Sequence, residues 1–349
     1  LNGGIRLRYG LNLEVPGAKL FVPVEGETVA FVRPRDVGYV SMQHENVRPP
    51  LGRGLRGVPT EVSGNSPFAR GIAEIMEEYG LKGEKLGIDT LEAGPMLDLV
   101  QAGLNLVDAE PTIEHAWTVK TDDEIVIYRE VGRQYIASLT AFRDAVRPGI
   151  TEKELADIVT VTWLQSGGED IAQLNVCAGE NMNPWRRWPT NRKLREGEFV
   201  GVDLHGRGQN GMRGDSSTTF LVGDHPTAEQ KDLYKRAYDY IQASIPVWRA
   251  GRTIAEAMAD VPQVPDRFRE KLWDLNYAHG VGMGSSGYPH MDPRRAPTED
   301  VLYRNQMLSV ECYFGEKGGS MAVKLEQQIA LRDGEPEVIG PIPMDERFL

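Results

Sequence analysis

Residues 308–331 read LSVECYFGEKGGSMAVKLEQQIAL, and this stretch decides the fold that the sequence predicts. Two β-rich runs, 308–314 and 321–331, flank the pair Gly318-Gly319. A Gly-Gly pair between such runs is typical of a two-residue hairpin turn. The stretch therefore predicts an antiparallel hairpin near the C-terminus of the chain.

The predicted hairpin places two carboxylates face to face. With the turn at the glycine pair, residues whose numbers sum to 637 oppose each other, so Glu311 lies opposite Glu326 at a Cβ separation of about 5 Å. Two ionised carboxylates at that distance repel by on the order of 3 kcal/mol at an effective dielectric constant of about 20. A metal, another cation or a shared proton would offset this repulsion. On this stretch alone, a metal site and a solvent-exposed pair are equally good interpretations.

Composition and charge exclude several classes of protein. The chain has 349 residues, 40% hydrophobic and 26% charged, and no apolar run approaches the roughly 18 residues of a membrane-spanning helix. The net charge of −12 argues against nucleic-acid binding, which needs a basic surface. Two cysteines are too few for a disulfide framework, which favours a reducing compartment, so we predict a cytoplasmic protein. From the charge and the apolar runs together, we predict no nucleic-acid or membrane partner. Because the chain opens on Leu1 without an initiator methionine, we expect N-terminal residues to be missing.

Residues 1–116 predict a small α/β domain. The expected elements are a hairpin over 19–32, a helix over 67–79, a strand over 85–88, a helix over 93–102 and a strand over 104–107. The ionisable residues of this domain show no metal-ligand or triad spacing, so we expect it to shape the molecule or support oligomerisation. A linker is expected over residues 111–120.

The rest of the chain carries an internal duplication. Residues 147–159 and 249–261 share Arg, Gly, Thr, Glu and Val at a fixed offset of 102. Each copy follows a long predicted helix, and capping boxes beginning at Thr121 and Thr151 mark two helix starts. The period is too long for a solenoid repeat. The pattern predicts one domain of two related halves, with a functional site where the halves meet.

The first half supplies a carboxylate hairpin of its own. Strands are predicted over 198–205 and 215–222, joined by a Gly-rich loop. Centring that loop on Gln209 makes Asp203 face Asp215. Each half then offers two opposed carboxylates, and four carboxylates in a partly buried place cannot all stay ionised without cations.

A histidine joins this set. His279 lies in the Gly-rich segment NYAHGVGMG, where backbone and ligand can approach closely. Taken alone, a histidine before a glycine is more often a structural hydrogen-bonding residue than a ligand. Together with the four carboxylates it gives an oxygen-rich site with one nitrogen, the ligand set of a dinuclear Mn, Fe, Co or Zn centre.

The order Asp, Asp, His, Glu, Glu, with these spacings and the duplication, resembles the creatinase/aminopeptidase P/methionine aminopeptidase superfamily, which has the pita-bread fold. The motifs that carry the resemblance are GVDLHG, RGDSSTTF, AHGVG, LSVE and VKLEQQ. It implies an α/β (α+β) protein with a pita-bread domain over 117–349 and a pseudo-twofold duplication. It also implies a smaller creatinase-type N-terminal domain over 1–116 and a homodimer.

The resemblance also implies a metal centre with two divalent ions. Asp203 would bind one ion, His279 and Glu311 the other, and Asp215 and Glu326 would bridge them. A water activated by the two ions is the nucleophile that the resemblance implies.

The departures from the superfamily concern proton transfer. Residues 179–188 read GENMNPWRRW where aminopeptidase P has a proton-shuttling histidine, and residues 286–289 read SGYP where a second histidine is expected. The sequence resembles the dimethylsulfoniopropionate lyase branch best, through Asn-Pro-Trp, a twelve-residue step between the two Asp ligands and a Gly-Gly hairpin leading into Lys-Leu-Glu. Even there, the acidic pair after the metal histidine is Ser285-Ser286, and the Asp-x-Asp is Asp203-Leu-His205.

Several residues are candidates for the missing roles. His205 shares a strand face with Asp203, so it is an additional ligand, a substitute base or a histidine merely hydrogen-bonded at a strand end. The candidate catalytic residues are His205, Ser286 and Tyr288, and the candidate substrate contacts are Trp185, Arg186, Trp188 and His290. Indole faces would suit a cationic substrate group and arginines an anionic one, the alternative being packing tryptophans and solvated arginines.

These observations predict a dinuclear-metal hydrolase that cleaves a C–N bond in a small amino-acid-like or dipeptide substrate. One alternative is a metal-dependent lyase. The other is a catalytically silent pita-bread domain that binds peptides, a class that typically loses its metal ligands, whereas all five positions are present here.

Overall fold

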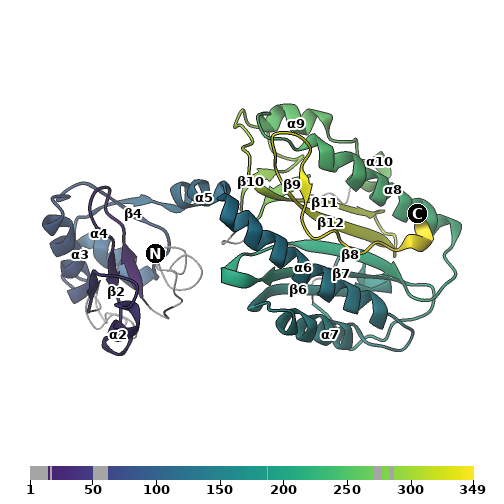
Figure 1. The fold of residues 1–349 in the computed structure, drawn as a ribbon, viewed down its shortest axis with the longest axis horizontal. Helices are drawn as coiled ribbons and strands as arrows, with labels where there is room; N and C mark the ends of the chain where they lie inside the picture. The colour runs from purple at the N-terminus through teal and green to yellow at the C-terminus, as the bar shows by residue number, and fades with distance from the viewer. Residues whose placement is uncertain (1–14, 16–17, 50–61, 187, 270–276, 283–286) are drawn as a thin grey trace. The chain divides into compact units, whose positions relative to one another are not determined.

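The computed structural model describes residues 15, 18–49, 62–186, 188–269, 277–282 and 287–349 (Figure 1). The chain divides into two compact units, Leu1–Ala116 and Trp117–Leu349. Across the residues described, each helix is too short or too polar to cross a membrane.

The first unit mixes short strands and helices. Its elements are β1 (Lys19–Phe21), β2 (Val29–Phe31), η1 (Pro34–Asp36), α2 (Val37–Val40), β3 (Val47–Arg48), α3 (Pro67–Glu78), β4 (Lys85–Ile88), α4 (Ala93–Gln101) and β5 (Asn105–Asp108). β2 pairs with β1 in the antiparallel sense and with β3 in the parallel sense, and β4 and β5 form a parallel pair. Apolar residues of α3, among them Ile72 and Met76, pack with Phe21 and Phe31.

The segment that we expected to be a linker is helical. α5 (Glu110–Thr118) covers most of residues 111–120, and the boundary between the two units, Ala116 to Trp117, falls within it. Pro111 did not exclude a helix because it lies in the first turn, where a missing N–H costs nothing.

The second unit is built from long helices and a large sheet. Its helices are α6 (Asp122–Ala145), α7 (Glu152–Gln165), η2 (Gly179–Asn181), η3 (Gln209–Gly211), α8 (Ala228–Ser244), η4 (Ile245–Val247), α9 (Ile254–Asp260), α10 (Asp266–Arg269) and η6 (Glu346–Phe348). Its strands are β6 (Asp170–Ala178), β7 (Phe199–Arg207), β8 (Ser216–Leu221), β9 (Ala278–Gly280), β10 (Gly287–Met291), β11 (Met307–Gly315), β12 (Ala322–Ala330) and β13 (Glu337–Val338).

The predicted capping boxes start the helices of both halves. Thr121 caps α6 and Thr151 caps α7, and in each box the side chain of the third helical residue bonds back to the threonine N–H. Thr253 caps α9 in the same way, at the position that corresponds to Thr151 in the duplicated segment. The duplication therefore repeats a local structure as well as a sequence.

The two halves share one sheet. Its strand order is β10-β9-β11-β12-β8-β7-β6, with β13 paired to β12. β6, β7 and β8 come from the first half and β9 to β12 from the second, so the halves meet where β8 pairs with β12. The meeting point places Ser217 opposite Glu326.

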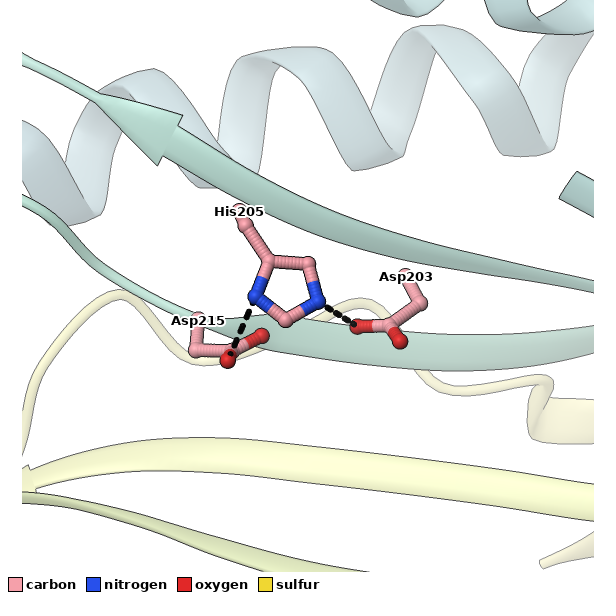
Figure 2. A group of neighbouring side chains, drawn as sticks. All are labelled: Asp203, His205 and Asp215. Atoms are coloured by element: carbon pink, nitrogen blue, oxygen red, sulfur yellow. Dashed lines mark ion pairs between the residues drawn. The ribbon is translucent and has the colours of Figure 1, made fainter. Parts of the chain in front are cut away.

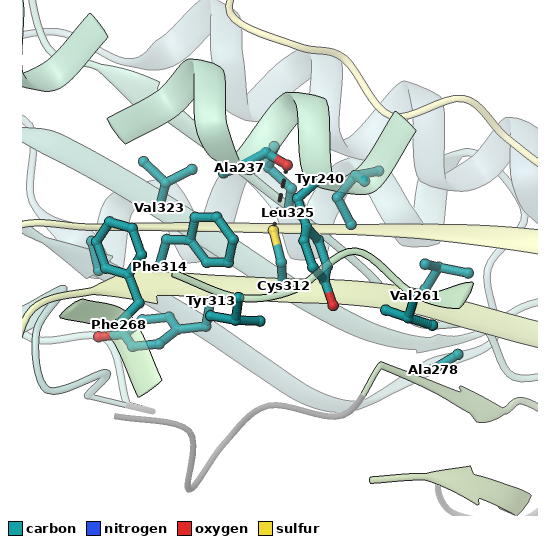
Figure 3. Packing of buried hydrophobic residues seen from close by; sticks show 14 of the residues in the cluster. Ala237, Tyr240, Val261, Phe268, Ala278, Cys312, Tyr313, Phe314, Val323 and Leu325 are labelled. Atoms are coloured by element: carbon teal, nitrogen blue, oxygen red, sulfur yellow. Dashed lines mark hydrogen bonds between the residues drawn. The ribbon is translucent and has the colours of Figure 1, made fainter. Parts of the chain in front are cut away.

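Helices α6, α7 and α8 pack on one face of this sheet. The Tyr135 hydroxyl of α6 bonds the backbone of Gly206, and the Trp163 ring of α7 lies so close to Gly206 that a Cβ there would meet it at 2.4 Å. On the other half, the Cys312 thiol bonds the Ala237 carbonyl of α8 at 3.6 Å (Figure 3). Because side chains alternate along a strand, residues next to these in sequence face the opposite side.

The register of the C-terminal hairpin is as predicted. β11 and β12 pair with residue numbers that sum to 637, and Glu311 lies opposite Glu326. The two-residue turn is wrong, because the last pair is Gly315 with Ala322. The Gly319 N–H bonds the Glu316 carbonyl at 3.0 Å, and Gly318 takes a left-handed φ of 75°. The loop is longer than predicted but has the same centre, so the register is unchanged.

The register of the first hairpin differs from the prediction by two residues. Asp203 lies opposite Ser217 rather than Asp215, with paired numbers that sum to 420. The loop contains η3, where Asn210 has a left-handed φ of 60°, and its centre lies one residue later than the centre at Gln209 that we assumed. A shift of two positions keeps each side chain on its original face, so both carboxylates still reach the same site.

Candidate metal centre

Strand pairing assembles a row of polar residues across the sheet, on the face opposite α6, α7 and α8. Asp203 on β7 lies opposite Ser217 on β8, Ser217 opposite Glu326 on β12, and Glu326 opposite Glu311 on β11. All four are buried. The row crosses the boundary between the two halves, so each half supplies part of it.

His205 and Asp215 extend the site by one step along the first hairpin. Arg207 and Arg213 form a bridge in the same register as the strands, which places His205 opposite Asp215. Figure 2 shows the imidazole between two carboxylates, with Nδ1 2.8 Å from Asp215 Oδ2 and Nε2 3.5 Å from Asp203 Oδ1. Each ring nitrogen of His205 therefore faces a carboxylate oxygen.

His279 reaches the site from β9. Its Nε2 lies 3.2 Å from Glu326 Oε1, 3.7 Å from Asp215 Oδ2 and 3.9 Å from Glu311 Oε1. Its Nδ1 lies 3.1 Å from the Gly280 carbonyl, which favours a proton on Nδ1 and leaves Nε2 directed at the carboxylates. The predicted set of two aspartates, one histidine and two glutamates is thus brought together.

Two groups of donor atoms share Asp215. Asp203, His205 and Asp215 form one group, and Asp215, His279 and Glu326 form the other, with ligand atoms in each group within 4.8 Å of one another. The second group lies beside Glu311. One aspartate common to two groups is the arrangement expected of a bridging ligand between two cations.

Sequence reasoning missed a buried lysine in this site. Lys324 is buried, and its Nζ lies 2.8 Å from Glu326 Oε2, 3.0 Å from Asp203 Oδ2 and 3.4 Å from Glu311 Oε2. Strand alternation was the available signal, because Lys324 precedes Glu326 by two residues and so shares its face. Lys324 offsets part of the repulsion that the facing glutamates imply.

Hydrogen bonds from neighbouring polar side chains orient the carboxylates. The Ser217 hydroxyl is 2.7 Å from Asp203 Oδ1 and 2.9 Å from Glu326 Oε2, and the Asn175 amide donates to Asp203 Oδ2 at 3.0 Å. Such partners fix the orientation of ligand side chains and are sensitive to mutation in metal sites.

The protonation of the carboxylates follows their distance from Lys324. Burial and the charge of Glu326 raise the pKa of Glu311 to about 7. Burial also disfavours the charge of Glu326, but the Lys324 ammonium and the His279 hydrogen bond lower the pKa of Glu326 to about 2. Burial and the charge of Glu326 raise the pKa of Asp215. Lys324 thus favours the ionised form of Glu326, whereas the pKa of Glu311, which lies farther from the ammonium, is raised.

Two buried atoms without hydrogen-bond partners in the described part of the chain indicate that the site fits divalent cations. Among the described residues, Asp215 Oδ1 and His205 Nε2 are buried atoms without a hydrogen-bond partner. Buried polar atoms are nearly always satisfied, so two such atoms in one cluster of ligands point to an additional bound group. Carboxylates and imidazoles suit Mn, Fe, Co and Zn.

The predicted substrate residues separate into buried and exposed ones. Trp185, a candidate substrate contact with packing as its alternative, is buried edge-on to Tyr313, with ring centroids 6.2 Å apart. The reason is Gly201, where a Cβ would meet the Trp185 ring at 2.9 Å. Arg186 and Trp188 are exposed, Trp188 to 72%.

The β9–β10 hairpin carries the remaining candidates. His290 lies opposite His279, with ring centroids 6.5 Å apart. The Tyr288 hydroxyl bonds Asp300, and burial together with that bond raises the pKa of Tyr288. Ser286 lies outside the described residues.

Comparison with known proteins identifies the class. Residues 127–333, more than half of the chain, match the model of metallopeptidase family M24, and the chain belongs to this family. The resemblance to the creatinase superfamily is therefore confirmed.

The individual relatives share about a quarter of their aligned residues with this chain. A dimethylsulfoniopropionate lyase from Roseovarius nubinhibens is 24% identical over 83% of this chain and 67% of its own length. A probable dipeptidase from Mycobacterium tuberculosis is 26% identical over 70% of this chain and 67% of its own length. The chain thus spans about two thirds of the length of these relatives.

Solved structures confirm the pita-bread fold. The chain superimposes on a dipeptidase from Pyrococcus horikoshii with a TM-score of 0.82 at 18% identity, covering 99% of this chain and 93% of the other. A mixed α/β architecture with a pita-bread domain therefore describes this protein.

Proposed function

We propose that this protein is a dinuclear-metal-dependent hydrolase that cleaves a C–N bond in a small amino-acid-like or dipeptide substrate. The observation that supports this most strongly is the pair of donor groups that share Asp215, in a chain of metallopeptidase family M24. The proposed ligands are Asp203, Asp215, His279, Glu311 and Glu326.

The bound cations would polarise the scissile carbonyl and lower the pKa of an attacking water. The chain's own residues orient the ligands. Ser217 bonds one oxygen of Asp203 and one of Glu326, and Lys324 contacts the remaining oxygen of Asp203 and the same oxygen of Glu326. The other Glu326 oxygen faces His279. Lys324 and Ser217 thus fix the orientation of the Asp203 and Glu326 carboxylates, with Glu326 Oε1 turned towards His279.

The β9–β10 hairpin is the proposed source of proton transfer and substrate contact. His290 and the proposed ligand His279 occupy paired positions, so their side chains lie on the same face of the sheet. His290 is exposed. This placement supports a role for His290 at the rim of the site, where the superfamily's peptidase histidines are missing from the sequence. We extend the proposal to substrate contacts by the exposed Arg186 and Trp188.

Metal analysis and substrate assays test the proposal together. Protein purified without chelator should contain about two equivalents of Mn, Fe, Co or Zn, and should release free amino acids from Xaa-Pro or other dipeptides. Dialysis against a chelator should abolish the activity, and added metal should restore it. Metal below about half an equivalent, or no amino acid released by fully loaded protein, would overturn the proposal.

A second candidate is a metal-dependent lyase. It is favoured by the lyases among the relatives, of which the Roseovarius nubinhibens protein covers 83% of this chain. Volatile sulfide formed from dimethylsulfoniopropionate, without amino acid release from dipeptides, would establish this alternative. A third possibility, a silent peptide-binding domain, predicts peptide binding by protein that lacks metal.

A further inference from the structure

The role of His205 can be argued beyond the five proposed ligands. His205 lies on β7 directly opposite Asp215 and two residues after Asp203. Its two ring nitrogens point at these two carboxylates, as Figure 2 shows, at 2.8 Å and 3.5 Å. Both nitrogens are therefore directed into the candidate metal centre.

This orientation does not suit a general base. A base needs a nitrogen lone pair directed at the proton that it removes. His205 has carboxylate oxygens opposite both nitrogens, so it has no nitrogen to offer to a substrate in this conformation. His290, exposed on the β9–β10 hairpin, is better placed for that role.

A purely structural role is also a poor fit. A structural histidine in a buried place has its ring nitrogens in hydrogen bonds. Here, within the part of the chain that the structure describes, His205 Nε2 has no hydrogen-bond partner, and neither has Asp215 Oδ1 beside it. The Asp215 side chain is only 5% exposed, so water does not readily satisfy that oxygen.

We propose that His205 is a sixth metal ligand, which completes with Asp203 and Asp215 a site for one divalent cation. This inference rests on the proposed function, because it takes Asp203 and Asp215 as ligands. Each of the two metal positions then has one imidazole, His205 at the first and His279 at the second. Imidazole suits Zn, Co and Fe, whereas all-oxygen sites suit Mg, Ca and Mn. The first position should therefore prefer Zn²⁺ or Co²⁺ to Mn²⁺.

Metal titration of variants tests this assignment. Isothermal titration of chelator-treated protein with Co²⁺ should give two equivalents for the parent chain. H205A should lose one of these equivalents or bind it at least 10-fold more weakly, while the other is unchanged. H205D should keep two equivalents, but the metal preference of the first position should shift from Co²⁺ towards Mn²⁺. H225A, which removes an exposed histidine, is the matched control and should behave as the parent.

X-ray absorption at the Co edge supplies a readout independent of activity. At a Co²⁺ concentration that fills both positions, the fitted number of imidazole ligands per two bound Co²⁺ ions should fall from two to one in H205A. Circular dichroism shows whether H205A is folded, and H205Q replaces it if it is not.

The outcomes separate this inference from the proposed function. Two equivalents of unchanged affinity in H205A, with an unchanged absorption spectrum, would overturn the role of His205 alone. Failure of the parent chain to bind Co²⁺ would overturn both proposals. Full binding with loss of one equivalent in H205A, but no hydrolysis of dipeptides, would support the sixth ligand and overturn the hydrolase.

Discussion

The two hairpins that build the site differ in what holds their register. The β11–β12 loop is centred on the Gly318-Gly319 pair, whereas the β7–β8 loop, closed by the Arg207–Arg213 bridge, contains a 3-10 turn around Asn210. The β11–β12 hairpin pairs two glutamates directly. The β7–β8 hairpin pairs Asp203 with Ser217 and His205 with Asp215. The same kind of site is thus built from a symmetric carboxylate pair in one half and an alternation of acid, hydroxyl and imidazole in the other.

This difference has an electrostatic consequence. The paired glutamates repel each other, and Lys324 on the same hairpin lies within 3.4 Å of both. The first hairpin separates its aspartates by two positions and places His205 between them. The C-terminal hairpin therefore places the Lys324 ammonium beside its carboxylates, whereas the β7–β8 hairpin places the His205 imidazole between its own. Four substitutions test this contrast, in decreasing order of expected effect.

The largest effect is expected from Glu326→Gln. Glu326 is the carboxylate that contacts His279, Ser217 and Lys324 at once. Its neutralisation should weaken metal binding by more than the roughly 10- to 100-fold typical of an outer partner of a ligand, measured by Co²⁺ titration. Glu316→Gln changes an exposed glutamate in the loop of the same hairpin and should leave the affinity unchanged. Equal affinities for the two variants would contradict the central place of Glu326.

The C-terminal hairpin was predictable for a physical reason. The Gly318-Gly319 pair marks the centre of its loop, and a period of two fixes the face, so Glu311 and Glu326 could be placed from their numbers alone. The Gly-rich β7–β8 loop marks no single centre, because its centre depends on the backbone conformation of Asn210. The two-residue error left Asp203 and Asp215 on the correct face but hid the direct pairing of Asp215 with His205.

Side-chain direction was harder to predict than side-chain position. Alternation places Lys324 on the face of Glu326, but a lysine at such a position usually extends its ammonium to water. The sequence left open whether Trp185 contacts substrate or packs, and its burial depends on the space above Gly201, which only the folded loop reveals. Both features depend on packing between segments distant in sequence.

The second largest effect is expected from Lys324→Met. Removing one partner from a buried ionic cluster costs about 3–5 kcal/mol, because the remaining charges lose their compensation. We expect urea denaturation of chelator-treated protein to show a loss of this size in the free energy of unfolding. Lys324→Arg keeps the charge and should lose less. Lys317→Met, in the exposed loop of the same hairpin, should stay within about 0.5 kcal/mol of the parent. If Lys324→Met lost no more stability than the small change expected of Lys317→Met, the hairpin would not depend on its buried ammonium.

A smaller effect on the metal is expected from Ser217→Ala. The hydroxyl bridges Asp203 and Glu326 at the junction of the two halves. Its loss should weaken Co²⁺ binding by about 10- to 100-fold, since it orients ligands without being one. Ser216→Ala removes a hydroxyl whose bond is to the Gln328 amide, and it should affect stability rather than metal affinity. A larger loss of Co²⁺ affinity in Ser216→Ala than in Ser217→Ala would contradict the role of Ser217 in orienting the ligands.

The smallest effect is expected from Gly318→Ala, which tests how the turn fixes the register. Gly318 has a φ of 75°, and a Cβ there would meet open space, so the substitution introduces backbone strain without a steric clash. A left-handed conformation costs an L-residue about 1–2 kcal/mol, which lowers the melting temperature by about 2–4 °C for each kcal/mol in a domain of this size. Gly334→Ala is the matched control, because its Cβ also meets open space and its φ is not in the left-handed range. The number of Co²⁺ equivalents should stay at two in both variants. Loss of an equivalent in Gly318→Ala alone would mean that the glycine sets the register of Glu311 and Glu326, and that the strand pattern does not hold it unaided.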